Sequence, residues 1–161
     1  MCSQSVKTPC VGLCSTVYGD LVCRGCKRYH HEIINWNLYG ESEKTAVLKR
    51  LEVLLVQVVS SKLEVFDQQL LQQQLEKRRI QYEKNRSCYC WVHQLLVKGA
   101  RRIGKVESYG IRLFPEFSHI SLPDLREMID REYFLLSEAH YERYVVPKHP
   151  AKKPDAPDAS S

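Results

Sequence analysis

TPCVGLCSTVYGDLVCRGCKRYHHEIINW (residues 8–36) contains four of the seven cysteines of this 161-residue chain. They are Cys10, Cys14, Cys23 and Cys26, so a C-x3-C pair and a C-x2-C pair are separated by eight residues. Two close thiol pairs joined by a short loop can converge on one centre, and thiolates are soft ligands that suit zinc or an iron–sulfur cluster. The stretch therefore predicts a metal site with these four cysteines as ligands.

The surrounding sequence indicates a reducing compartment. The N-terminal residues MCSQSVKTPC lack the apolar core of a signal peptide, and no apolar run is long enough to cross a bilayer. We therefore expect a cytoplasmic protein without membrane contact, in which clustered cysteines bind metal or do redox chemistry more often than they form disulfides. A redox dithiol at Cys23 and Cys26 would normally lie between a strand and a helix of an α/β fold, and no such pattern surrounds the pair.

A family resemblance rests on PCVGLC, CRGCKR and EIINW, followed by the charged stretch EKTAVLKRL. In this order they resemble the small bacterial YdhL-type proteins, a family of unknown function whose members are commonly labelled predicted iron–sulfur proteins. The resemblance covers about residues 8–57 and implies that the four cysteines bind metal, without implying an activity. Zinc and an iron–sulfur cluster both remain open, because the spacing matches neither ferredoxin pattern and zinc sites accept varied spacings.

Apolar periodicity predicts a mainly α fold for the rest of the chain. A short helix at residues 30–36 is expected to pack Ile33, Ile34 and Trp36 over the metal loop. A longer helix should start at an N-cap Ser42 and stop near residue 60, and a capping box at residues 61–64 should open a further helix through Arg86. The last helix should begin with Ser121 as its N-cap.

These elements divide the chain into three predicted parts. Residues 1–40 form the four-cysteine metal-binding module, residues 41–146 a helical domain, and residues 147–161 a disordered tail rich in proline and charge. Within the helical domain, KVESYGIRLFPEFSHISL (residues 105–122) mixes β-branched and aromatic residues with glycine and proline, which predicts a short β-hairpin or an irregular extended segment.

Two further cysteines raise the question of a second metal site. Cys88 and Cys90 lie close to His93, but the group lacks a clear fourth ligand. The neighbouring apolar residues predict a buried helix in which the thiols fill space, since free cysteine is among the most buried residue types.

Basic residues concentrate in one part of the chain. From Glu76 to Lys105 there are nine Lys and Arg against two Glu, a net charge of +7, whereas the whole chain carries +5. Lys98, Arg101, Arg102 and Lys105 are candidates for binding RNA or DNA, and Tyr82 and Trp91 could stack on bases if they are exposed. The alternative is a solvated basic face that balances the acidic C-terminal helix, because no nucleic-acid-binding signature is present.

No catalytic constellation stands out, so we expect a protein that is not an enzyme. Two function classes follow from the cysteines. The first is a metal-stabilised binding or adaptor protein, in which the metal contributes folding energy and the helices contact a protein partner or nucleic acid. The second is an iron–sulfur protein that transfers electrons or senses oxidants.

Overall fold

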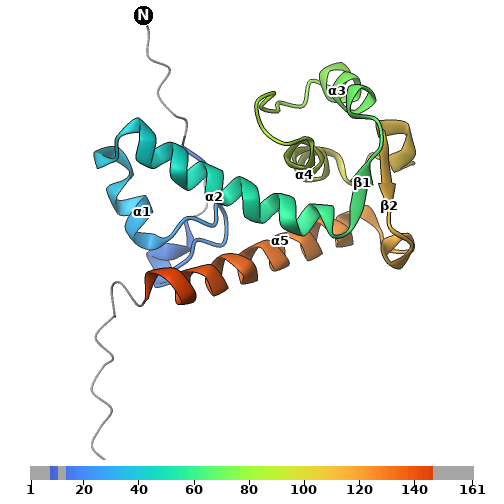
Figure 1. Ribbon diagram of the computed structural model, residues 1–161. Helices are drawn as coiled ribbons and strands as arrows, with labels where there is room; N and C mark the ends of the chain where they lie inside the picture. The colour runs from blue at the N-terminus through green and yellow to red at the C-terminus, as the bar shows by residue number, and fades with distance from the viewer. Residues whose placement is uncertain (1–7, 11–13, 147–161) are drawn as a thin grey trace, which may run out of the picture.

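The fold is mainly α-helical, as the sequence predicts (Figure 1). The computed structural model describes residues 8–10 and 14–146, and the predicted tail at residues 147–161 lies outside the described residues. Five α-helices and a two-stranded antiparallel sheet make up this part of the chain. None of the helices in residues 8–10 and 14–146 has the length and apolar character needed to span a membrane.

Two long helices form the axis of the molecule. α2 (Glu41–Ser60) and α5 (Leu122–His140) lie side by side and run in opposite directions, and α4 (Cys88–Gly99) packs against both (Figure 1). Each helix turns an apolar stripe inward, and Leu54, Val92 and Leu125 are at most 1% exposed. Each buried aliphatic side chain contributes about 1.5–3 kcal/mol, so this three-helix contact is the main core.

The helix starts confirm one predicted cap and correct another. The hydroxyl of Ser121 accepts the N–H of Asp124 at 3.3 Å, so Ser121 is the N-cap of α5 as predicted. The predicted N-cap Ser42 is wrong, because α2 already begins at Glu41 with Gly40 as its N-cap.

A small antiparallel sheet joins two distant segments. β1 (Leu63–Val65) pairs with β2 (Ile111–Leu113), with Leu63 opposite Leu113. The predicted strand within residues 105–122 is therefore present, but its partner β1 comes from a much earlier part of the chain and not from the same segment. Gly110 precedes β2 with a φ of 73°, and a Cβ there would lie 2.2 Å from the carbonyl oxygen of Asp67, so only glycine fits.

Residues 61–64 do not form the predicted capping box, because β1 occupies this place. α3 (Gln68–Lys77) instead starts at Asp67, whose carboxylate accepts the N–H of Leu70 at 3.0 Å. Only Phe66 separates Asp67 from the end of β1, so α3 begins just after the strand.

α3 also ends at Lys77, well before the predicted end at Arg86. The N–H of Ile80 bonds to the carbonyl of Leu75 at 2.9 Å, and the N–H of Arg79 to that of Glu76 at 3.1 Å. This is the Schellman arrangement, in which the first residue after the cap is left-handed and is usually glycine. Here it is Arg79, with a φ of 57°, so a residue with a Cβ occupies a position that favours glycine at a cost of roughly 1–2 kcal/mol.

The N-terminal module lies against one end of the two long helices. A 3-10 turn (Ser15–Tyr18), a loop that contains the second cysteine pair, α1 (His30–Asn35) and a second 3-10 turn (Trp36–Leu38) make up the module (Figure 1). Trp36 is buried as predicted, but Ile34 is 62% exposed, so the prediction that Ile34 packs over the loop is wrong. With six residues α1 is too short to bury more than one side.

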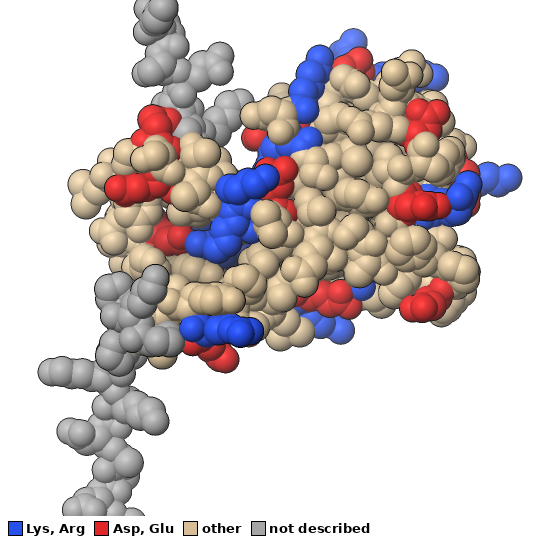
Figure 2. All heavy atoms as spheres, viewed as in Figure 1, with Lys and Arg blue, Asp and Glu red and all other residues tan. Residues whose placement is uncertain are grey.

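The remaining elements are short. A 3-10 turn at Val106–Tyr109 precedes β2, another at Pro115–Phe117 follows it, and a π-helical turn at Tyr141–Val145 continues α5. On the face drawn in Figure 2, basic and acidic side chains are interspersed and most of the surface is uncharged. Charge on this face is therefore mixed in sign.

Candidate metal centre

The second cysteine pair flanks a tight turn. The N–H of Cys23 donates to the carbonyl of Arg28 at 2.9 Å, and the N–H of Lys27 donates back to the carbonyl of Cys23 at 2.8 Å. One step outward, Val22 and Tyr29 form an antiparallel bridge. Lys27 has a φ of 66°, which reverses the chain directly after Cys26. The sequence CRGCK thus forms a closed loop with a cysteine on each side.

Cys23 and Cys26 lie in contact inside this loop. The Cys23 thiol is 1% exposed, and it accepts a hydrogen bond from the Cys26 thiol and from the backbone N–H groups of Ser15, Gly25 and Cys26. Burial raises the pKa of Cys23, but these donors outweigh it and lower the pKa from 9.0 to about 7. Backbone dipoles therefore stabilise the thiolate form, which is the form that binds metal.

Cys26 has a charged donor. The Nε of Arg28 donates to its Sγ at 3.4 Å, and the guanidinium lies 4.8 Å from the centre of the Trp36 ring. Burial raises the pKa of the Cys26 thiol, and Arg28 partly opposes this by stabilising the thiolate. Arg28 thus places a cation directly beside the buried Cys26 sulfur.

The first cysteine pair, Cys10 and Cys14, is less closely associated with the turn than the second pair is. The hydroxyl of Ser15 accepts the N–H of Arg24 at 2.8 Å, which brings the residue after Cys14 to the C-x2-C turn. The Sγ of Cys14 lies 2.8 Å from the hydroxyl of Thr16, and Cys10 is exposed. Within residues 8–10 and 14–146, no three His, Cys, Asp or Glu side chains are close enough together to hold a metal ion. The Cys23–Cys26 pair fits a thiolate site, whereas Cys10 and Cys14 do not lie close enough to this pair to form a metal-binding group with it.

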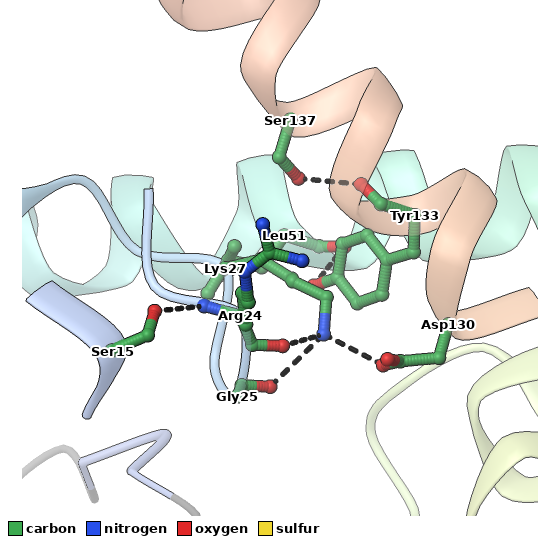
Figure 3. A network of polar contacts seen from close by, with 8 residues as sticks. All are labelled: Ser15, Arg24, Gly25, Lys27, Leu51, Asp130, Tyr133 and Ser137. Carbon is green, nitrogen blue, oxygen red and sulfur yellow. Dashed lines mark hydrogen bonds and ion pairs between the residues drawn. The ribbon is translucent and has the colours of Figure 1, made fainter. Parts of the chain in front are cut away.

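Lys27 fastens the turn to α5 (Figure 3). Its side chain is 1% exposed, and its Nζ donates to the carbonyls of Arg24 and Gly25 and to Oδ1 of Asp130 at 2.7 Å. The ammonium also lies 5.3 Å from the centre of the Tyr133 ring. A buried ammonium needs such partners, because an unpaired buried charge costs several kcal/mol.

A second ion pair fastens α1 to α2. Both guanidinium NH2 groups of Arg50 bind the carboxylate of Glu32, at 2.6 and 2.7 Å, and the guanidinium lies 3.9 Å from the centre of the Tyr29 ring. Glu32 is 5% exposed and also accepts the N–H of Tyr29 at 2.8 Å. Burial lowers the pKa of Arg50, but the contact with Glu32 outweighs burial and raises it. Glu32 thus caps α1 and pairs with α2 at once.

A small apolar cluster completes the contact. Val22 and Tyr29 of the module pack against Phe134 of α5, with Tyr141 and Val145 beside them. The module is therefore held by two ion pairs and a separate apolar contact.

Cys88, Cys90 and His93 do not gather as a metal site within the described residues. Cys90 is 4% exposed in the main core, and burial raises its pKa to about 11, which favours the thiol over the thiolate. Burial and the nearby Lys27 lower the pKa of His93 to about 4, with Asp130 opposing this and Arg126 and Arg86 adding to it. Packing is thus the role the structure gives Cys90, as predicted.

The basic candidates are only partly grouped. Lys98, Arg101 and Arg102 lie together at the end of α4 and line one hollow, whereas Lys105 does not line it. Trp91 is 3% exposed and donates its indole N–H to the carbonyl of Glu83 at 2.8 Å. Stacking of Trp91 on bases required an exposed ring, and this condition is not met because the ring is in the core.

Comparison with known protein families finds one partial match, which begins in the cysteine-rich stretch and ends within α2. A family model described as "Protein of unknown function (DUF1289)" matches residues 8–54. Residues 8–54 form a DUF1289 domain. The domain lies within the 8–57 stretch that carries the sequence resemblance, and its description gives neither an activity nor a cofactor. No match is found among curated proteins or among solved structures.

Of the two ion pairs that hold the module, one lies wholly within the DUF1289 domain and the other lies only partly within it. Glu32 and Arg50 both lie within it, and so does Lys27, whereas Asp130 and Tyr133 lie far beyond it on α5. Sequence reasoning missed these anchors. A signal was present in Glu32, which follows Tyr29 by the three residues expected of a carboxylate that caps a helix start.

We predict that Glu32→Gln lowers the free energy of unfolding by about 2–4 kcal/mol, because it leaves the half-buried Arg50 guanidinium without its carboxylate. Urea unfolding followed by circular dichroism measures this. Glu43→Gln is the matched control, since Glu43 is exposed on α2 and forms no ion pair within the described residues. Equal stability of the two variants would show that the pair does not anchor the module.

We predict a pH-dependent contribution from His93. Its folded pKa of about 4 lies below the ordinary 6.5, so the unfolded chain binds the proton first as the pH falls. Stability should then drop by about 1–2 kcal/mol more in the wild type than in His93→Gln between about pH 7 and about pH 5. Urea midpoints at both pH values measure the difference, and parallel pH profiles would contradict a His93 that stays neutral in the folded protein.

Proposed function

We propose that Cys10, Cys14, Cys23 and Cys26 hold one metal centre and that the protein is a metal-stabilised binding module of the cytosol. The observation that carries this is the environment of Cys23, whose buried thiol receives three backbone N–H groups and a neighbouring thiol. Hydrogen bonds from backbone amides to sulfur reduce the charge on a thiolate, and a thiolate is the species that binds metal.

The charge around the site supports the proposal. Four thiolates outnumber the two positive charges of a zinc ion, so a closed site carries net negative charge. Arg28 donates to Cys26, and the backbone of Lys27 and Arg24 is part of the turn itself. Arg28 thus stabilises the Cys26 thiolate before a metal arrives.

Metal binding would draw Cys10 and Cys14 toward the Cys23–Cys26 pair. The contact between Ser15 and Arg24 already holds the chain after Cys14 at the turn, so Cys14 has the shorter way to move. The energy of coordination would thus add to the stability of the module, as structural metals do in small domains.

Zinc and an iron–sulfur cluster lead to different roles. Zinc has no redox chemistry and would only stabilise the module, whereas a cluster could transfer electrons or sense oxidants, as the YdhL-type resemblance suggests. The module is fixed to α2 and α5 by two ion pairs, which suits a structural metal that presents a rigid surface. For this reason we propose the binding role, with the redox role as the outcome expected if the metal is iron.

We predict about one metal centre per chain in protein produced in a reducing cytosol and purified without oxygen. Elemental analysis measures zinc and iron, and absorption in the visible range reports a cluster. Cys23→Ser should lose most of the metal, because serine is a poor ligand for a soft site. Cys88→Ser is the control and should keep the metal, since Cys88 lies on α4, outside the four-cysteine stretch.

The two variants decide the assignment together. Full metal content in Cys23→Ser would exclude Cys23 as a ligand. Equal loss in both variants would point to a general folding defect, and urea unfolding of Cys88→Ser would then reveal it.

A further inference from the structure

The basic segment carries positive charge that ion pairs among the described residues leave largely unneutralised. Its two acidic residues are both engaged: Glu76 pairs with Lys84 at 3.8 Å, and Glu83 with Arg86 at 4.0 Å. The other seven basic residues of the segment form no ion pair within residues 8–10 and 14–146. They are Lys77, Arg78, Arg79, Lys98, Arg101, Arg102 and Lys105.

Most of these cations surround two adjoining hollows. The first, of about 430 Å³, lies between the end of α3 and α4, and Arg78, Arg79, Lys98 and Arg102 line it with no acidic residue. The second, of about 250 Å³, lies between α4 and the start of α5 and adds Arg101, Arg126 and Glu127. Lys98, Gly99 and Arg102 line both, so the hollows are continuous around the end of α4.

The negative ends of the helix dipoles offset only a small part of this positive charge. α3 and α4 both end here, and each C-terminus carries about half a negative charge. Six cations line the two hollows, and Glu127 is the one acidic residue among the lining residues. An excess of about four positive charges remains after the dipoles are counted.

We propose that the two hollows bind the phosphodiester backbone of a nucleic acid. A row of unpaired cations around two connected hollows fits successive phosphates better than a single anion does, because each phosphate contact releases condensed counterions. Base stacking plays no part: the Trp91 ring is in the core, and the Tyr82 ring packs against it at 5.0 Å while its hydroxyl donates to Glu76. Binding is therefore independent of base sequence.

Arg79 gives independent support. Its left-handed φ of 57° closes α3, where glycine would be more stable. Strained residues of this kind cluster at functional sites. Its side chain lines the first hollow, so the strain holds a guanidinium at the site. Arg79→Gly thus separates the two roles: it relieves the backbone and removes the cation.

Fluorescence anisotropy tests the proposal, with labelled single-stranded RNA, single-stranded DNA and duplex DNA of mixed sequence. The full chain should bind them at low salt. Arg101→Ala/Arg102→Ala should flatten the slope of log affinity against log salt by about 1.4 for single strands. From about 50 to about 200 mM salt the wild type should then lose about sevenfold more affinity than the variant.

Lys49→Ala/Arg131→Ala is the matched control. It removes the same charge from exposed positions on α2 and α5 that line neither hollow. It should retain the wild-type slope. Arg79→Gly should weaken binding although its melting temperature is equal to or higher than that of the wild type.

Three outcomes would overturn the proposal. The first is no association with any of the three nucleic acids at low salt. The second is an equal change of slope in the Arg101/Arg102 and Lys49/Arg131 variants. The third is equally tight binding of polyglutamate, which would make the surface a docking site for an acidic protein.

Discussion

A buried ammonium group decides how the cysteine turn sits on the helices. Lys27 directly follows Cys26 and is 1% exposed, so its charge has to be met by the protein. Two carbonyls of its own turn and the carboxylate of Asp130 do this. The same contacts therefore close the C-x2-C loop and press it onto α5, and the left-handed backbone of Lys27 is the geometry that lets its side chain reach both.

This constraint links the DUF1289 domain to a helix outside it. The matched residues end at Leu54, in the middle of α2, and they contain Lys27 and the Glu32–Arg50 pair. α5 supplies what the domain lacks: Asp130 for the ammonium, Phe134 for the apolar contact, and the Tyr133 hydroxyl, which donates to the carbonyl of Leu51 at 3.2 Å. In this chain the module and the helices are thus joined by direct polar and apolar contacts, while the chemistry we propose for each is separate.

Apolar periodicity and N-cap residues correctly predicted those helices whose apolar residues recur along one buried face. α5 shows this best, because Ser121 caps it and its apolar residues recur at helical spacing. The prediction failed where a contact distant in sequence overrides local signals. β1 displaces a plausible capping box only because it can pair with β2, and α3 stops at a left-handed Arg79 where no glycine marks the end.

The candidate site was half predictable for the same reason. Spacing alone singled out the four cysteines, and the closed turn around Cys23 and Cys26 agrees with it. The anchors Asp130 and Arg50 had no signal of their own, since an exposed and a buried charge look alike in sequence until the fold brings a partner. Likewise, the excess of basic residues was evident from the sequence. Only the structure shows that both acidic residues of the segment form ion pairs and that Trp91 is in the core.

Native mass spectrometry of the full chain, produced in a reducing cytosol and kept from oxygen, tests the central claim most directly. The account predicts one main species whose mass exceeds that of the bare chain by one zinc ion or one iron–sulfur cluster. Acid should return it to the bare mass, because protonated thiols do not bind metal. A main species at the bare mass before acid treatment, in protein that is folded by circular dichroism, would contradict the claim that the four cysteines form a metal centre.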